Sequence, residues 1–224
     1  MEYITNHIRL IGTMDSAPVF SHENHGRQFY SFFLDVERLS GTVDRLRVLA
    51  DLALLNATDC AWGERILVTG QVRSYNQLDE TGRHLIISVY AEGIELTDEE
   101  PDDVVTLTGT LCRDPVYRRT PLGREICDGM LAVSRGYRRT DYLPCIFWGR
   151  TARRMAELST GARITLTGRL QSRGYNKLLP DGQSERRVAY EISAVTAELG
   201  YGDYVITTSN APVKNGDLVR LADS

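Results

Sequence analysis

The chain repeats itself at an interval of about 97 residues. Three pairs of segments align in the same order: IGTMDSAPVF (11–20) with TGTLCRDPVY (108–117), FLDVERL (33–39) with MLAVSRG (130–136), and, with one residue more between them, GERILVTGQV (63–72) with GARITLTGRL (161–170). Because order and spacing hold over about ninety residues, the sequence predicts a duplicated domain.

The repeat also sets the expected domain organisation. We expect a first domain over residues 1–97 and a second over residues 104–198. The acidic, proline-containing stretch 98–103 between them is typical of a short linker. Residues 199–224 form a turn-rich C-terminal extension with one further strand-like piece at 203–208 (DYVITT).

Each copy shows the periodicity of β-strands. Residues 66–72 and 164–170 alternate apolar and polar side chains and are rich in β-branched residues. Each has a glycine in mid-strand, Gly70 or Gly168, where a strand of a small barrel bends or forms a bulge.

One short helix per copy is expected between the third and fourth of five strands. The helical segments are 52–61 and 151–159, the latter capped by Thr151. This order of elements predicts an all-β fold of two tandem five-stranded oligonucleotide/oligosaccharide-binding (OB) barrels. An SH3-like barrel is the structural rival, and the position of the helix counts against it.

The two copies differ in charge. Residues 1–100 contain 8 basic and 16 acidic residues, a net charge of −8, whereas residues 101–197 contain 16 basic and 10 acidic residues, a net charge of +6. Of the 26 basic residues, only Lys177 and Lys214 are lysines. Arginine holds phosphate through two parallel hydrogen bonds and stacks on flat rings, so the second copy has the charge expected for a nucleic-acid partner.

Four aromatic residues accompany this charge: Tyr137, Tyr142, Trp148 and Tyr175. Tyr142 and Trp148 are six residues apart on one predicted strand, so both point to the same face. Tyr137 and Tyr175 lie in polar segments that read as hairpins, the second with Asp181–Gly182 as its turn. The basic residues expected beside these rings are Arg113, Arg118, Arg119, Arg135, Arg138, Arg139, Arg150, Arg173 and Lys177.

Rings beside arginines suit single-stranded nucleic acid. Every base has a flat face that stacks on an aromatic ring, while a basic groove follows the backbone. Duplex DNA hides these faces. Each ring taken alone is equally well explained as packing, and each arginine as a solvated side chain, so the prediction depends on their occurring together in the second copy.

The second copy resembles the bacterial single-stranded DNA-binding protein (SSB) family. The resemblance covers about ninety residues and is carried by VTLTGTLCRDPVYRRTPLG, LAVSRGY, YLPCIFWGRTARRMAELSTGARITLTGRLQSRGYNK and RVAYEIS. It implies sequence-independent binding and protection of single-stranded DNA in replication, recombination or repair. Matched by position, the family's base-stacking rings fall on Tyr137, Tyr142, Trp148 and Tyr175, although the family often has Trp where this chain has Tyr.

The first copy departs from that pattern. Ser40, Arg45 and Asp51 stand at the positions of the first three rings, and only Tyr75 keeps an aromatic side chain. Its acidity would repel phosphate, so we interpret it as a barrel kept for assembly. The family generally assembles four OB barrels, which implies a homodimer here. The family's acidic tip ending in proline and phenylalanine is not seen in GDLVRLADS, which puts recruitment of replication proteins by that route in doubt.

Two other classes of function stay open. Asp35, Glu37, Asp44 and Asp51 could hold metal for a nuclease, but the chain lacks the G-x-x-x-x-G-K-[ST], G-x-S-x-G and H-E-x-x-H motifs, so we expect no enzyme. An adaptor of a primosome complex, acting through protein contacts, is the main alternative. Stacking alone does not separate DNA from RNA.

The remaining expectations are absences. The four cysteines form no C-x-x-C pair and do not group with the histidines, so we expect reduced, packed thiols and no metal or other cofactor. The first thirty residues carry no basic start followed by an apolar run, and no apolar stretch approaches the roughly 18 residues that span a bilayer. We therefore expect a cytoplasmic, nucleoid-associated protein.

Overall fold

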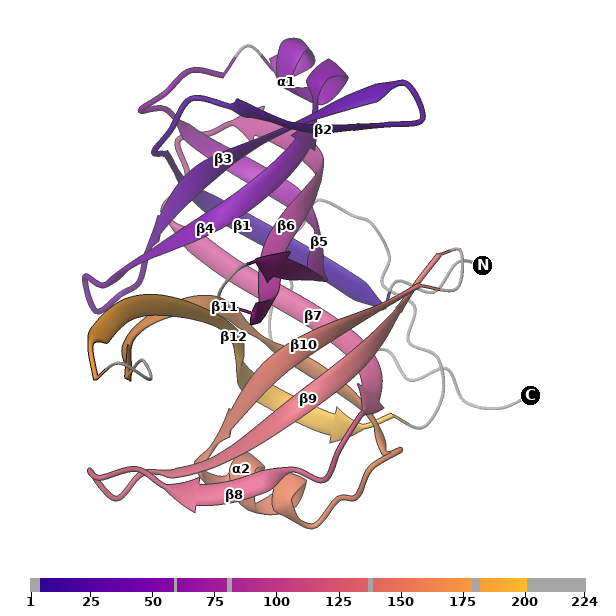
Figure 1. Cartoon of the computed structure of the whole chain (residues 1–224), viewed down its shortest axis with the longest axis vertical. Helices are drawn as coiled ribbons and strands as arrows, with labels where there is room; N and C mark the ends of the chain where they lie inside the picture. Colours follow the sequence, from indigo (N-terminus) through magenta and orange to yellow (C-terminus); the bar gives the residue numbers. More distant parts are fainter. Residues whose placement is uncertain (1–4, 59, 80–81, 137–138, 179–181, 201–224) are drawn as a thin grey trace.

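The chain folds into two β-barrels stacked along the long axis of the molecule (Figure 1). The computed structural model describes residues 5–58, 60–79, 82–136, 139–178 and 182–200. The two short helices lie at opposite ends of the stack. Of the expected C-terminal extension, residues 201–224, with the strand-like piece 203–208, lie outside the described residues.

The first barrel contains six strands and one helix. They are β1 (Asn6–Met14), β2 (Val19–Asn24), β3 (Arg27–Glu37), β4 (Val43–Asp51), α1 (Leu52–Thr58), β5 (Arg65–Asp79) and β6 (Gly82–Leu96). The second barrel repeats this order. Its elements are β7 (Asp102–Leu111), β8 (Val116–Arg119), β9 (Glu125–Arg135), β10 (Arg139–Trp148), α2 (Gly149–Ala156), β11 (Arg163–Leu178) and β12 (Ser184–Leu199).

Each barrel closes as an OB fold does. In the first, β1 pairs with both β5 and β3, and β4 runs parallel to β6. In the second, β7 pairs with both β11 and β9, and β10 runs parallel to β12. The predicted pair of OB barrels, each with a helix between its fourth and fifth labelled strands, is confirmed. The short strands β2 and β8, which pair only with β3 and β9 within the described residues, are the addition to the expected five.

The two mid-strand glycines mark bulges, as predicted. The pairing register shifts between Thr69 and Gly70 in β5 and between Thr167 and Gly168 in β11. A Cβ at Gly168 would lie 2.3 Å from the backbone oxygen of Ser193, and one at Gly70 would lie closer still to the carbonyl oxygen of Tyr90. Only glycine lets the facing strand approach so closely at these bends.

The helix of the second barrel starts earlier than expected. α2 begins at Gly149, and the residue before it, Trp148, caps it without a side-chain hydrogen bond. The prediction that Thr151 caps this helix is therefore wrong. Gly149 has φ +54°, a left-handed conformation that turns the chain directly from β10 into α2. In the first barrel the same turn is capped by Asp51, which accepts a hydrogen bond from the Ala53 amide at 2.7 Å.

β1 and β7 join the two barrels into one sheet. They pair antiparallel, with Asn6 opposite Leu107 and Leu10 opposite Asp103. Adding the repeat interval of 97 to Asn6 and Leu10 gives Asp103 and Leu107, so the junction has the symmetry of a two-fold axis. β6 ends at Leu96 and β7 begins at Asp102, which leaves residues 97–101 as the connection.

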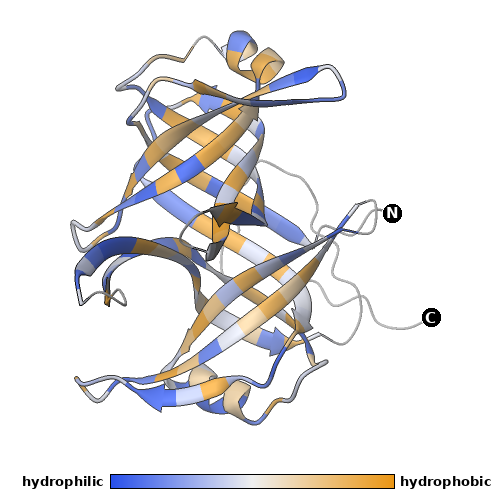
Figure 2. Cartoon of the chain, in the orientation of Figure 1, coloured by the Kyte–Doolittle hydropathy of each residue, from blue (hydrophilic) through white to orange (hydrophobic). Residues whose placement is uncertain are grey.

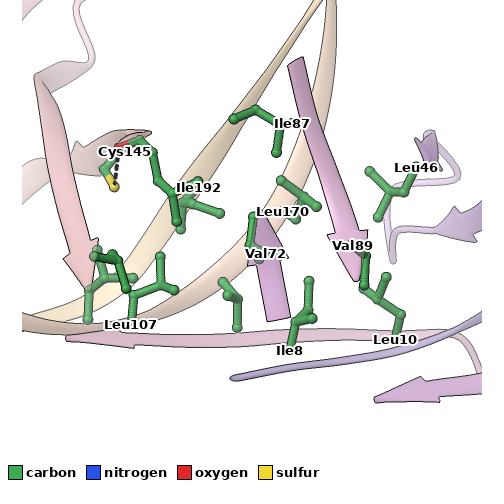
Figure 3. Packing of buried hydrophobic residues seen from close by; sticks show 14 of the residues in the cluster. Ile8, Leu10, Leu46, Val72, Ile87, Val89, Leu107, Cys145, Leu170 and Ile192 are labelled. Carbon is green, nitrogen blue, oxygen red and sulfur yellow. Dashed lines mark hydrogen bonds between the residues drawn. The ribbon is translucent and has the colours of Figure 1, made fainter. Parts of the chain in front are cut away.

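The buried apolar side chains of both barrels form one continuous cluster. Figure 3 shows Ile8 and Leu10 of β1 in a row with Leu107 of β7, facing Val72 and Leu170. Each of these five side chains is at most 2% exposed. The two copies therefore share a core across the β1–β7 junction.

Candidate nucleic-acid interface

β10 points successive side chains alternately into the barrel and outward, and Ile146 is the one outward residue between Tyr142 and Trp148 that is buried. Leu143, Cys145 and Phe147 are at most 2% exposed, whereas Tyr142 and Trp148 are 47% and 38% exposed. The predicted alternation is confirmed, and both rings lie on the outer face of one strand. Burial raises the pKa of the Cys145 thiol, so this sulfur stays protonated and packs as an apolar group.

Trp148 is held in a fixed orientation. Its indole N–H donates a hydrogen bond to the Ser193 Oγ of β12 at 3.0 Å. This contact anchors the ring edge while the side chain stays more than one third exposed. A ring oriented in this way loses little conformational entropy when a base stacks on it.

Tyr175 lies on the β11–β12 hairpin and is 38% exposed. β11 and β12 pair antiparallel as the two strands of the predicted hairpin, with Tyr175 opposite Arg187. Asp181 of the predicted turn lies outside the described residues. The guanidinium of Arg173 lies 6.0 Å from the centre of the Tyr175 ring. Tyr175 also lines a shallow hollow with Gly174, Asn176 and Arg186. The projecting part of this hairpin is largely hydrophilic (Figure 2).

A chain of contacts connects Trp148 to Tyr175 across the outside of the barrel. Trp148 bonds to Ser193, and Glu191, two residues away on β12, lies on the same face of that strand. Glu191 pairs with Arg173 at 3.6 Å, and Arg173 lies over Tyr175. Tyr142, Trp148 and Tyr175 thus belong to one outer surface formed by β10, β12 and β11, which we call the ring face.

Four of the predicted arginines are already engaged by acidic side chains of the same barrel. Arg118 bonds to Asp128 at 2.5 Å, and Arg119 pairs with Glu125 at 3.5 Å. Arg173 pairs with Glu191, as described above. Arg135 binds both carboxylate oxygens of Asp141, which is 1% exposed.

One of these acidic partners, Glu125, is held in its charged form. Hydrogen bonds from Arg153 and then from Tyr117 lower the pKa of Glu125 to about 2. Glu125 therefore carries its full negative charge at neutral pH beside Arg119 and Arg153. The side chain of Asp128, the partner of Arg118, is more exposed than that of Glu125. Because ion pairs at exposed positions are weak, Arg118 can exchange its carboxylate for a phosphate at small cost.

Three further predicted arginines, Arg113, Arg139 and Arg150, are exposed and make no ion pair with any residue that the structure describes. Tyr137 and Arg138 lie outside the described residues, and so does the side chain of Lys177. The structure thus brings three of the four predicted rings onto one surface.

The first barrel uses the equivalent positions differently. Arg45, at the position of Tyr142, lies 4.8 Å from the centre of the Phe33 ring and pairs with Asp15. Asp51, at the position of Trp148, caps α1 and pairs with Arg27 at 2.5 Å. Its pKa is lowered, first by the hydrogen bond from the Ala53 amide. Two positions that carry rings in the second barrel therefore serve charge pairing and helix capping here.

Exposed aromatic side chains also occur in the first barrel. Phe20 on β2 is 54% exposed and Trp62, before β5, is 73% exposed. Tyr75, the counterpart of Tyr175, is 47% exposed. Sequence reasoning did not single out Phe20 or Trp62. Trp62 aligns with no ring of the second copy, and Phe20 aligns with Tyr117, which is not among the four predicted rings.

The sequence did not predict a pair of reciprocal hydrogen bonds, in which a backbone amide of each barrel donates to an aspartate of the other. The Ser74 amide on β5 donates to Asp141 on β10 at 2.6 Å, and the Ser172 amide on β11 donates to Asp44 on β4 at 2.7 Å. Each aspartate is also held by an arginine of its own barrel, Asp141 by Arg135 and Asp44 by Arg38. The only sequence signal is that both Arg–Asp pairs recur at the repeat interval.

In the part of the chain that the structure describes, no three His, Cys, Asp or Glu side chains gather where they could hold a metal ion. Cys127 and Cys145 are buried, Cys60 and Cys112 are partly buried, and no disulfide joins any two of them. No described helix has the length and apolar character needed to cross a membrane.

Comparison with protein families places a match in the second barrel. Residues 103–199 match the model of the Single-strand binding protein family. Single-stranded DNA-binding protein 1 of Lactococcus lactis is 33% identical over 102 residues, covering 42% of this chain and 65% of that protein. Single-stranded DNA-binding protein A of Bacillus subtilis is 34% identical over 101 residues, covering 42% of this chain and 56% of that protein. The chain thus spans less than two thirds of the length of these relatives.

A solved structure matches both barrels. The wild-type single-stranded DNA binding protein from Thermus aquaticus aligns with 92% of this chain and 98% of its own, with a TM-score of 0.69 and 24% sequence identity. A deletion mutant of the same protein aligns with a TM-score of 0.71. At this identity the likeness concerns the fold, and it extends to the arrangement of two barrels in one chain.

Proposed function

We propose that the chain belongs, through residues 103–199, to the single-strand binding protein family and that its second barrel binds single-stranded DNA without sequence preference. The observation that supports this most directly is the ring face, on which Trp148, Tyr142 and Tyr175 lie together. A nucleic-acid strand that crosses β10, β12 and β11 would meet all three. Each stacked base contributes about 1–3 kcal/mol.

The arginines of the second barrel would supply the remaining attraction. Arg113, Arg139 and Arg150 are exposed, and Arg118 lies in a surface ion pair that a phosphate can replace. Phosphate neutralisation releases condensed counterions, so binding weakens as salt rises. Duplex DNA offers the same phosphates but no exposed base faces, and the rings would then add nothing.

In the cell, this activity would protect exposed single strands during replication, recombination or repair, on the nucleoid in the cytoplasm and without catalysis. We further propose that two chains pair to bring four barrels together, as the family resemblance implies. Light scattering would then give twice the 25.2 kDa of one chain.

Binding of fluorescently labelled oligo-dT, measured by anisotropy from low to physiological salt, tests the proposal. We expect tight, length-dependent binding, with a log–log salt slope of about −0.7 for each phosphate neutralised. A duplex of the same length should bind more weakly at every salt concentration. Oligo-U in place of oligo-dT shows whether the site separates DNA from RNA.

The first barrel supports one alternative, an adaptor that acts mainly through protein contacts. It is acidic and exposes Phe20 and Trp62, a combination that suits a basic protein surface better than phosphate. Failure of the protein to bind oligo-dT even at low salt would favour this alternative over single-strand binding.

A further inference from the structure

The N-terminal half of β10, which carries Tyr142, is paired with a neighbouring strand on one side only. β10 pairs with β9 along its whole length, from Arg139 to Trp148. On its other side it pairs with β12 only over Cys145–Phe147. The backbone near Tyr142 therefore has an open edge that no strand of its own barrel fills.

The first barrel fills this edge with Ser74. The Ser74 Oγ of β5 accepts a hydrogen bond from the Tyr142 amide at 2.8 Å, and the Ser74 amide donates to the Asp141 Oδ1 at 2.6 Å. Ser74 is 8% exposed and Asp141 is 1% exposed, so these bonds are shielded from water. Arg135 holds the same Asp141 carboxylate and reaches the Ser74 carbonyl at 3.5 Å.

The reciprocal contact lacks this feature. Ser172 of the second barrel bonds to Asp44 through its amide at 2.7 Å and through its Oγ at 3.0 Å. The residue after Asp44 is Arg45, which lies over Phe33 and pairs with Asp15. The two contacts are alike as inter-barrel links, but only the Ser74 contact holds the backbone of an exposed ring on the ring face.

We propose that Ser74 is a positioning residue for nucleic-acid binding, through which the first barrel fixes the main chain at Tyr142. This role rests on the proposed function of the second barrel. A ring whose backbone is fixed before binding loses less entropy when a base stacks on it, so removing the Ser74 hydroxyl lowers affinity without touching the nucleic acid. The acidic first barrel thus holds the main chain of one residue of the ring face in place.

The test is a double-mutant cycle of Ser74→Ala and Tyr142→Ala in the full chain, with labelled oligo-dT as the probe. Ser74→Ala keeps the amide bond to Asp141 and removes the acceptor for the Tyr142 amide. It also removes the longer bond of 3.5 Å that the Ser74 hydroxyl donates to the Asp141 Oδ1, and Ser172→Ala removes the equivalent hydroxyl bond to Asp44. We expect Ser74→Ala to weaken binding about 3- to 10-fold in the wild-type background, and to add no loss in the Tyr142→Ala background.

Ser172→Ala is the matched control, since it removes a hydroxyl from the mirror contact. Ser172→Ala should change the affinity for oligo-dT by the same factor in the wild-type background and in the Tyr142→Ala background. Thermal unfolding of each variant establishes that it is folded, and Ser74→Thr, which keeps a hydroxyl, should bind more tightly than Ser74→Ala.

Three results would overturn the inference. If Ser74→Ala leaves the affinity for oligo-dT unchanged, Ser74 has no positioning role. The role is also excluded if Ser74→Ala lowers the affinity equally in the wild-type and Tyr142→Ala backgrounds. Affinity unchanged by Tyr142→Ala shows that there is no bound ring for Ser74 to position. If the wild-type protein fails to bind oligo-dT at low salt, the proposed function itself fails, whereas the other results leave it standing.

Discussion

Asn6 and Asp103 occupy the same position in the two copies, and each bonds to the backbone of one residue on the neighbouring strand. The Asn6 Nδ2 donates to the Val72 carbonyl at 2.7 Å, and its Oδ1 accepts from the Val72 amide at 2.9 Å. The Asp103 Oδ1 accepts from the Leu170 amide at 3.2 Å, but its Oδ2 is buried without a hydrogen-bond partner among the described residues. A charged carboxylate therefore fits this position less well than an amide.

The surroundings of Asp103 favour its neutral form. Burial, which has the largest effect, raises its pKa to about 8, and the carboxylates of Asp44 and Asp102 act in the same direction. The Leu170 amide and Arg169 oppose this rise. A protonated Asp103 has one donor and one acceptor, as the Asn6 amide does.

We predict that Asp103→Asn stabilises the protein increasingly as pH rises. The folded-state pKa lies above the unfolded value of 3.8, so the favourable contribution of Asp103 is complete below about pH 4 and is lost as pH rises through about 8. Urea unfolding at pH 5, 7 and 9 should show that the unfolding free energy of Asp103→Asn exceeds that of the wild type by a margin that grows with pH and reaches about 1–3 kcal/mol. Asn6→Asp, the reciprocal control, should destabilise most at high pH. A pH-independent difference for Asp103→Asn would contradict this account.

The inter-barrel contacts should depend on their buried aspartates. Asp141→Ala leaves the Arg135 guanidinium without its carboxylate, in a position where its side chain is only 25% exposed. We expect a loss of about 3–5 kcal/mol in the free energy of unfolding, and a similar loss for Asp44→Ala. Asp128→Ala, which breaks the surface pair with Arg118, is the control and should cost at most about 1 kcal/mol. Equal losses for Asp141→Ala and Asp128→Ala would show that burial does not set the strength of these pairs.

The bulge in β11 should tolerate no side chain. In Gly168→Ala the added Cβ would lie 2.3 Å from the Ser193 carbonyl oxygen, so the two strands must move apart. We expect a loss of about 1–3 kcal/mol in unfolding free energy. Gly136→Ala is the control, because the space around Gly136 is open, and it should be neutral or slightly stabilising. If both variants unfold at the same denaturant concentration, the close approach of the strands is not needed.

Local patterns predicted a large part of this molecule. The repeat predicted two barrels, the alternation along β10 predicted that Tyr142 and Trp148 share its outer face, and Gly70 and Gly168 predicted bulges. Each of these signals lies within a short stretch of chain, where the period of the side chains reports which face is buried.

Contacts between the copies could not be predicted in the same way. Ser74 and Asp141 are 67 residues apart, and Ser172 and Asp44 are 128 residues apart. No local periodicity describes which hairpin reaches which strand, because the outcome depends on the β1–β7 junction that sets the barrels against each other. Likewise, the turn at Gly149 depends on a backbone conformation rather than on a capping side chain.

The central claim is that the ring face of the second barrel binds single strands, and the two tryptophans of the chain test it most directly. The measurement is oligo-dT affinity for Trp148→Ala, on the ring face, and for Trp62→Ala, an equally large truncation on the first barrel. We predict that Trp148→Ala weakens binding by about 1–3 kcal/mol, while Trp62→Ala binds as the wild type does. Wild-type affinity for Trp148→Ala, or an equal loss for both variants, would contradict the account.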